Sequence, residues 1–282
     1  MSEKRVYTTN YSDPVLNTHK WRTLANSASY VLPYLTKPNM KVLDVGCGPG
    51  SLTIDIGRHV VPNGGQVIGT DYVAEPLETA ERLLQATAPE LVGNRIKFQV
   101  ANIYSLPFPD DSFDLVHVHQ VLEHIADPVA GLKEMRRVAK TSDGIVACRE
   151  WANTCFYPPD SLRGLGDWED LFFRFIGANG GHPNSGRCMH VWAEEAGFEL
   201  SRVKRSAGTW CFSTPEERQY FGGSMAKRMR DYSSSGGFAT KVVEGGFATK
   251  EDLEAIAKAW DRYVADDHAW LGFLHGEILC WK

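Results

Sequence analysis

The 282-residue chain lacks features that would place it among several classes of protein. No apolar stretch approaches the ~20 residues that a membrane span needs, and the opening "MSEKRVYTTNYSD" has no apolar core of a signal peptide. Long runs of lysine and arginine are also missing, and the formal net charge is −5, so no basic surface for nucleic acid is expected. We therefore expect a cytoplasmic protein without a membrane or nucleic-acid partner.

The sequence also lacks the cysteine and histidine spacings of disulfide frameworks and zinc sites. The cysteines form no C-x-x-C pair and no ladder of short spacings, so free thiols are expected. They stand at Cys47, Cys148, Cys155, Cys188, Cys211 and Cys280. His117 and His119 are a close pair on a predicted strand, where both point to one face. That pair is a weak indication of a metal site, and we expect no metal.

What is present is an alternation of apolar runs and amphipathic segments. Strands are predicted at 41–46, 66–71, 95–100, 113–119 and 143–149, and helices between them at 51–60, 75–88 and 127–140. This order predicts an α/β, Rossmann-like fold with a mostly parallel sheet flanked by helices, and ligands beyond the carboxyl ends of the strands.

Elements are also expected outside this central alternation. The amphipathic segment 15–35 predicts a helix before the first strand, and residues 184–197 and 199–207 predict a helix and a strand. Two capping boxes, at Thr214/Glu217 and Thr249/Asp252, predict helix starts. The hexamer "GGFATK" occurs at 236–241 and 245–250, which favours a mobile glycine-bounded loop, and "WLGFLHGEILCWK" predicts a last strand.

The stretch "VLDVGCGPGSLTIDIG", residues 42–57, predicts a strand, a tight turn and a helix. Its glycines at 46, 48 and 50 allow backbone conformations closed to other residues and the close approach of a ligand. A dinucleotide fingerprint would read G-x-G-x-x-G, but the third glycine comes one residue early and Ser51 takes the expected place. A pyrophosphate site is therefore disfavoured.

Asp44 followed by G-x-G-x-G resembles the nucleoside-binding turn of class I S-adenosylmethionine-dependent methyltransferases, and the resemblance extends over about residues 38–150. It implies a seven-stranded sheet and S-adenosyl-L-methionine as cofactor. At the second strand's end it places Asp71 and Tyr72, with Asp71 on the ribose hydroxyls. At the third it places Asn102 and Ile103 on the adenine, where Asn replaces the usual acid. The implied cofactor-binding residues include Asp44, Gly46, Cys47, Gly48 and Gly50, with His119 and Gln120 at the methionine.

Two further phrases resemble narrower groups within this class. "GGHPNSGRCMHVWAEEAGF" is similar to small-molecule methyltransferases of ubiquinone and menaquinone biosynthesis. "YSDPVLNTHKWRTLANSASYVLPYL" resembles the fungal enzymes of secondary metabolism that methylate thiols of epidithiodioxopiperazines such as gliotoxin. The second resemblance implies that Tyr11, His19 and Arg22 close over the cofactor, although these residues also suit the surface of an amphipathic helix.

We expect a single methyltransferase domain over 1–282. Its parts are an N-terminal cap helix (1–37), a cofactor-binding core (38–150), lid insertions (151–184 and 209–265), and the rest of the core (185–208 and 266–282). Methyl transfer from a sulfonium removes positive charge, so an apolar lid that excludes water would help. The first insertion looks irregular and rich in turn residues. The candidate lid residues are Trp151, Phe156, Tyr157, Trp168, Phe172 and Trp210, some of which would simply be core.

The acceptor and its activation stay open at this stage. His119 and His182, with His124 as a weaker candidate, are possible general bases, but none lies in an identifying pattern. The absence of a clear base favours a thiol acceptor, which is partly ionised at neutral pH. The alternatives are carbon or oxygen methylation on a quinone-like or polyketide-like ring, and a cofactor-binding protein without activity. The oligomeric state is not predicted.

Overall fold

The computed structural model describes residues 21–93, 95–158, 163–233 and 237–282. Its centre is a seven-stranded sheet in the order β3-β2-β1-β4-β5-β7-β6, in which β7 alone runs in the direction opposite to the other strands. The strands are β1 (Lys41–Val45), β2 (Gln66–Asp71), β3 (Ile96–Val100), β4 (Leu115–His119), β5 (Ile145–Tyr157), β6 (Val203–Phe212) and β7 (Trp270–Trp281). The predicted fold class is confirmed.

The helices agree with the predicted periodicity in the first half of the chain. The α-helices are α2 (Leu24–Ser27), α3 (Ser51–Val60), α4 (Glu75–Thr87), α5 (Pro128–Val138), α6 (Arg163–Ala178), α7 (Met189–Glu195), α8 (Pro215–Arg230), α9 (Phe238–Glu244) and α10 (Lys250–Ala265). Short 3₁₀ turns are η1 (Ser29–Tyr34), η2 (Val61–Asn63), η3 (Pro89–Leu91), η4 (Leu122–His124), η5 (Ser185–Arg187) and η6 (Leu200–Arg202). The capping boxes at Thr214 and Thr249 are both formed.

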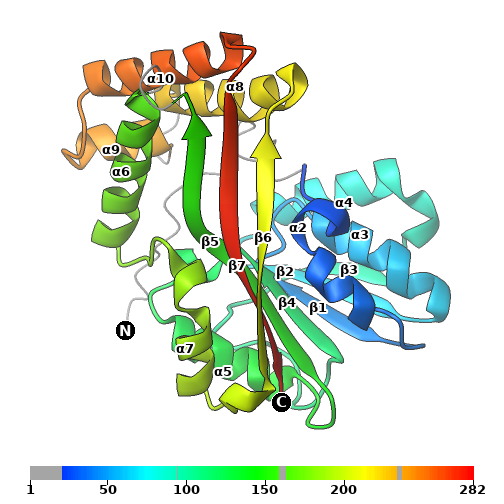
Figure 1. Cartoon of the computed structure of the whole chain (residues 1–282). Helices are drawn as coiled ribbons and strands as arrows, with labels where there is room; N and C mark the ends of the chain where they lie inside the picture. The colour runs from blue at the N-terminus through cyan, green and yellow to red at the C-terminus, as the bar shows by residue number, and fades with distance from the viewer. Residues whose placement is uncertain (1–20, 94, 159–162, 234–236) are drawn as a thin grey trace.

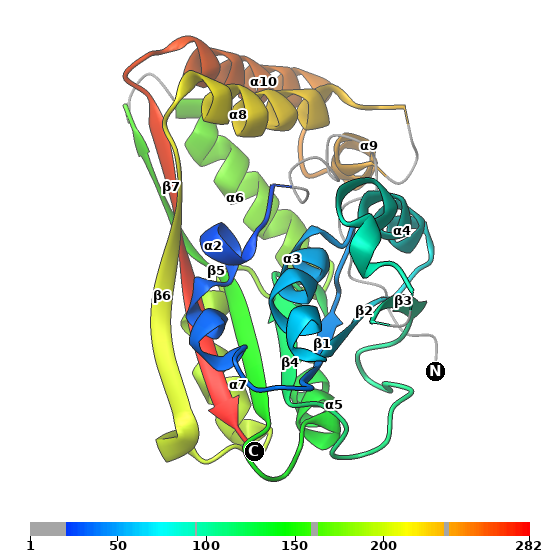
Figure 2. The same cartoon turned by 90° about the vertical axis from the view of Figure 1, so that its right-hand side faces the viewer.

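Both faces of the parallel part of the sheet are covered, as its apolar strands predict. Val42 of β1 belongs to a core shared with α3 and η1, whereas the next residue, Leu43, belongs to a core shared with α5 and α7. Successive side chains of a strand point to opposite faces, so one strand supplies both cores. Figure 2 shows α3 and α4 beside β1 and β2 in the view turned by 90°.

The predicted continuous helix over 15–35 is wrong for the part that the structure describes. There α2 is only one turn long, because the Thr23 side chain caps it from the N-terminal side and Ala28 leaves the helical conformation. The chain continues as η1, which contains Pro33. Residues 15–20 of that prediction lie outside the described residues.

The long strands β5, β7 and β6 extend from the rest of the sheet to a layer formed by α6, α8, α9 and α10 (Figure 1). Residues 151–157, expected to be irregular, continue β5 because they pair with β7 as far as Tyr157↔Trp270. Likewise residues 209–212 extend β6. Aromatic and aliphatic side chains fill this layer, with Trp260 fully buried among them.

The mobile loop expected around the repeated hexamers is also corrected. The segment contains α9, whose Phe238, Ala239 and Val242 are buried in the same core as α8 and α10. These three positions lie on one face of a helix, and burying that face stabilises a segment whose glycines alone suggested a loop.

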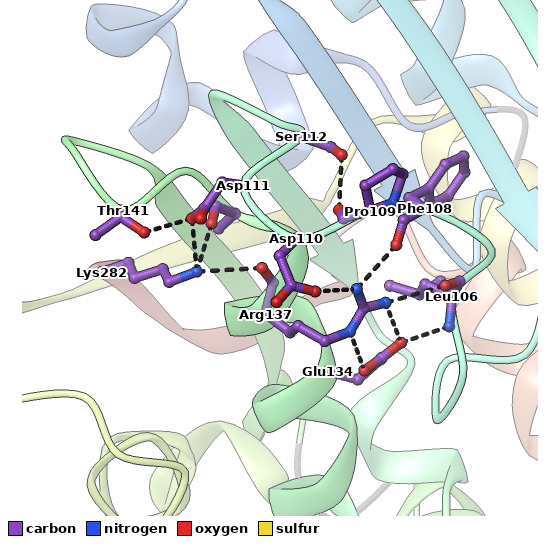
Figure 3. A network of polar contacts seen from close by, with 11 residues as sticks. Leu106, Phe108, Pro109, Asp110, Asp111, Ser112, Glu134, Arg137, Thr141 and Lys282 are labelled. Atoms are coloured by element: carbon purple, nitrogen blue, oxygen red, sulfur yellow. Dashed lines mark hydrogen bonds and ion pairs between the residues drawn. The ribbon is translucent and has the colours of Figure 1, made fainter.

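A polar network fixes the loop that leads into β4 (Figure 3). Arg137 of α5 donates to the carbonyls of Leu106 and Phe108 at 3.1 and 2.9 Å and to the Asp110 carboxylate at 2.7 Å. The terminal Lys282 donates to the Arg137 carbonyl at 3.1 Å. These contacts hold the start of β4, and therefore help to place His119 at its other end.

Candidate active site

A cavity of about 490 Å³ lies beyond the carboxyl ends of β1, β2 and β4. One side, which we call the turn side, is formed by Arg22, Asp44, Gly46, Cys47, Gly48, Asp71, Tyr72, Asn102, Ile103, His119 and Gln120. A second part of the wall, which we call the aromatic side, is formed by Trp151, Trp168, Phe172, Trp210, Phe221, Met225, Arg228, Lys241 and Phe273. The structure thus brings most of the predicted residues to one cavity. Tyr11 and His19 lie outside the described residues.

The glycine turn connects β1 to α3 in the conformation that its sequence predicts. Gly46, Gly48 and Gly50 all have left-handed backbones, with φ of 70°, 53° and 78°. A Cβ on Gly50 would lie 2.6 Å from that of Ala80, so this glycine permits close packing against α4. Gly48, by contrast, lines the cavity, where a side chain would occupy ligand space.

Asp71 joins the end of β2 to that turn. It is 8% exposed, and its Oδ2 accepts a hydrogen bond from the Gly48 backbone N–H at 3.0 Å. The neighbouring Tyr72 is exposed and also lines the cavity. An acid at this position can accept hydrogen bonds from the hydroxyls of a ribose.

The end of β3 presents Asn102 and the buried Ile103 to the cavity. The Asn102 side-chain carbonyl, which the resemblance places on the adenine, accepts from the Tyr104 backbone N–H at 3.0 Å. A carbonyl oxygen has two lone pairs, so this local turn leaves it acceptor capacity. Ile103 offers an apolar surface suited to a ring.

Gln120, directly after β4, links three parts of the chain across the cavity. It has a left-handed backbone with φ of 53°, and its Oε1 accepts from the Arg22 guanidinium. Its Nε2 lies 3.3 Å from Nε2 of His275 on β7. Arg22 also lies over the Trp210 ring, 5.6 Å from the ring centroid. The segment before α2 is therefore held across the turn side of the cavity.

His119 is buried on the cavity wall, and among the described residues neither of its ring nitrogens has a hydrogen-bond partner. Burial, together with the positive charges of Arg22 and Arg149, lowers its pKa well below the ordinary value. The ring is therefore neutral at pH 7, and its protonated form is strongly disfavoured. That environment suits contact with a ligand better than general-base catalysis.

The other candidate base, His182, does not line the cavity. Its Nε2 lies 3.3 Å from the Ala126 carbonyl, to which it donates, and its backbone N–H donates to the Glu123 carbonyl at 2.8 Å. His124 does line the cavity, with Nε2 3.3 Å from the Glu123 carboxylate. The buried Glu123 is a cavity residue that sequence reasoning missed.

Glu150 does not line the cavity but binds the backbone of the turn that does. Its carboxylate accepts from the backbone N–H groups of Val121, Leu122 and Glu123 at 2.9, 2.9 and 3.3 Å. Burial and the adjacent Glu123 raise the Glu150 pKa to about 8, against the lowering effect of these donors. The carboxyl group therefore orders the turn that carries Glu123 and His124.

Four of the predicted lid aromatics, Trp151, Trp168, Phe172 and Trp210, belong to the aromatic side. The Trp151 ring lies 5.8 Å from that of Trp168 and 5.6 Å from that of Phe172. Trp210 is fixed by a 2.7 Å hydrogen bond from Nε1 to the Asn26 carbonyl. Two further candidates, Phe156 and Tyr157, lie at the end of β5 and do not line the cavity.

Five residues of the aromatic side were not predicted from the sequence: Phe221, Met225, Arg228, Lys241 and Phe273. The first three have a sequence signal that could have found them, because spacings of four and three residues put them on one face of α8. Lys241 and Phe273 have no such signal, since they reach the cavity only through the packing of α9 and β7.

In the described parts of the chain no three His, Cys, Asp or Glu residues are grouped to hold a metal ion, and no helix is long and apolar enough to cross a membrane.

A glycine turn after β1 and an acid at the end of β2, both at one cavity beyond the carboxyl ends of the strands, define a nucleoside-binding protein of the class I methyltransferase fold. Residues 36–168 match a family described as a methyltransferase domain. An uncharacterized methyltransferase of Schizosaccharomyces pombe is 32% identical to this chain, over 99% of the chain and 97% of that protein. The chain belongs to the methyltransferase family and is an S-adenosylmethionine-dependent methyltransferase.

Two other similarities are partial or distant. A demethylmenaquinone methyltransferase of Geobacillus stearothermophilus is 34% identical over 60% of this chain and 70% of that protein. A structure of a Haemonchus contortus phosphoethanolamine N-methyltransferase, with S-adenosylhomocysteine, covers 96% of this chain and 58% of that chain at 17% identity, with a TM-score of 0.56. The latter likeness supports the fold alone.

Proposed function

We propose that the protein transfers a methyl group from S-adenosylmethionine to a thiol of a small, largely apolar metabolite, such as the reduced dithiol of an epidithiodioxopiperazine. One observation carries the small apolar acceptor: the aromatic side and the turn side line one cavity of about 490 Å³. Bound S-adenosylmethionine supplies the methyl group from a sulfonium centre. In the proposed arrangement Asp71 binds the ribose, Asn102 and Ile103 the adenine, and His119 and Gln120 the methionine part, while Gly48 gives access to the backbone.

The choice of sulfur rests on the state of His119. Its lowered pKa makes it a poor proton acceptor, and His182 donates to a carbonyl outside the cavity. A thiol has an ordinary pKa near 8.5, so a fraction of it is ionised at pH 7 without a general base. The protein then needs only to position the thiolate and to exclude water, the role we give to Trp151, Trp168 and Trp210. Arg22, bound to Gln120, closes the turn side in this proposal, and Tyr11 and His19 join it there.

The second candidate is carbon or oxygen methylation on a quinone-like or polyketide-like ring. It is favoured by the pair Glu123–His124, since a histidine beside a buried carboxylate can act as a general base. The similarity to a demethylmenaquinone methyltransferase supports the same alternative.

The deciding experiment uses the purified protein, isotopically methyl-labelled S-adenosylmethionine and a panel of reduced dithiols, phenols and quinols. We expect label on sulfur, at a rate that rises with pH through the thiol pKa of the substrate. Label on oxygen or carbon with none on sulfur would move the assignment to the second candidate. Tight cofactor binding without transfer to any of the panel would favour the cofactor-binding protein without activity.

A further inference from the structure

Lys241 of α9 is a cation on a wall that is otherwise mostly apolar. Its side chain is half-buried and lines the cavity, whose wall also includes Phe172, Phe221 and Met225. Burial lowers its pKa below the ordinary lysine value. Within the described ranges it forms no ion pair with a carboxylate.

An ammonium group that loses part of its water shell without gaining a counter-ion destabilises the folded protein. In α9, Phe238, Ala239 and Val242 are buried in the core, whereas Lys241 lines the cavity. A bound anion would supply the missing counter-charge.

Arg228 places a second cation on the same wall. It lies on the α8 face shared by Phe221 and Met225, and its guanidinium lies 5.9 Å from the centroid of the Phe238 ring. Phe238 is one turn before Lys241 on α9, so both cations border the meeting line of α8 and α9. Guanidinium groups bind carboxylates and similar oxygen anions with directional hydrogen bonds.

Glu123 is a buried carboxylate that also lines the cavity. Its Oε1 lies 3.3 Å from Nε2 of His124 on the short turn η4, after β4. Among the described residues Glu123 is paired with His124 and forms no ion pair with Lys241.

We propose that the thiol acceptor carries a second group, an anionic oxygen group such as a carboxylate, on its apolar body, and that Lys241 and Arg228 bind this group while the aromatic side holds the body. The inference rests on the proposed function, because it concerns the acceptor of the same cavity. Lys241 is accordingly a specificity-determining residue, distinct from the residues assigned to the cofactor.

Two fluorescent probes with the same aromatic body test this proposal. The sulfonate 1-anilinonaphthalene-8-sulfonate carries an anionic oxygen group, and N-phenyl-1-naphthylamine lacks it. Their affinities are measured for the full chain with and without saturating S-adenosylhomocysteine, whose own binding is measured by titration calorimetry. Lys241→Gln removes the charge, Lys241→Arg keeps it, and Lys227→Gln removes an exposed lysine of α8 outside the cavity as the matched control.

We expect the native protein to prefer the sulfonate, and Lys241→Gln to weaken sulfonate binding about tenfold, the effect of a lost charged hydrogen bond, with the neutral probe unchanged. Lys241→Arg and Lys227→Gln should keep the preference. Equal affinity for both probes, or equal losses in Lys241→Gln and Lys227→Gln, would overturn the proposal. Failure of S-adenosylhomocysteine to bind would instead overturn the proposed function. In that case the affinities of the two probes, measured without S-adenosylhomocysteine, would still decide the role of Lys241.

Discussion

Nδ1 of His117 lies 2.8 Å from Oδ1 of Asp44, and the two residues are directly opposite each other on the neighbouring strands β4 and β1. The other oxygen of Asp44 accepts from the Thr53 hydroxyl of α3. All three side chains are buried. The aspartate that begins the glycine-turn motif therefore ties two strands and the following helix together beneath the cavity.

Replacing Asp44 with alanine should destabilise the fold. The change leaves the donors of His117 and Thr53 buried without an acceptor, and each such group costs about 1–3 kcal/mol. Urea unfolding followed by circular dichroism should show a lower midpoint than for the native protein. A midpoint that does not move would mean that water or a neighbouring group replaces the carboxylate.

Asp71→Ala should weaken the binding of S-adenosylmethionine by about 1.5–3 kcal/mol, the contribution of hydrogen bonds to a charged acceptor. Titration calorimetry measures the effect, and Glu81→Ala, which removes an exposed acid of α4, is the control. Native affinity in a folded Asp71→Ala protein would remove Asp71 from the cofactor site.

Gly48→Val should abolish cofactor binding while the helical content stays unchanged, because the new side chain projects into the cavity. Part of any effect comes from backbone strain, since φ at Gly48 is 53°. Gly93→Val provides the matched control: its φ is 121°, and a Cβ there meets nothing within 4 Å. If both variants bind the cofactor like the native protein, the turn has only a structural role.

Single replacements of His119, His124 or His182 by asparagine should each reduce turnover far less than the roughly 10²–10⁴-fold expected for loss of a general base. The native rate should rise with pH through the thiol pKa of the acceptor. Steady-state kinetics on variants with verified cofactor binding provides the measurement. A single histidine whose loss stops turnover would favour the ring acceptor, and His124, beside Glu123, is the position where we would expect it.

The raised pKa of Glu150 predicts how stability depends on pH. The folded carboxyl group, with a pKa of about 8, holds its proton at pH values where an unfolded glutamate, with a pKa of about 4.3, has lost it. Its stabilising contribution is therefore complete below about pH 4 and is lost as the pH rises to about 8. The free energy of unfolding should fall more steeply between pH 6 and 8 in the native protein than in Glu150→Gln. Parallel pH profiles would show that Glu150 does not titrate in that range.

The sequence by itself determined the elements whose signals are local. The strands near residues 41–46, 66–71 and 113–119, the helix at 51–60 and both capping boxes depend on periodicity and on contacts three or four residues apart. The alternation of these elements was enough for the fold class, since parallel strands joined by helices leave few arrangements. It also placed Asp71, Asn102 and His119 at one edge of the sheet.

The tertiary structure decided what depends on distant partners. Residues 151–157 became strand because β7, more than 100 residues later, pairs with them, and α9 formed because its apolar face is buried against α8. The same packing brought Lys241 to the cavity and turned His182 toward the Ala126 carbonyl. A sequence pattern reports the faces of one element, but the side chains that share a cavity, and the charges that shift their pKa values, are fixed only when the elements pack together.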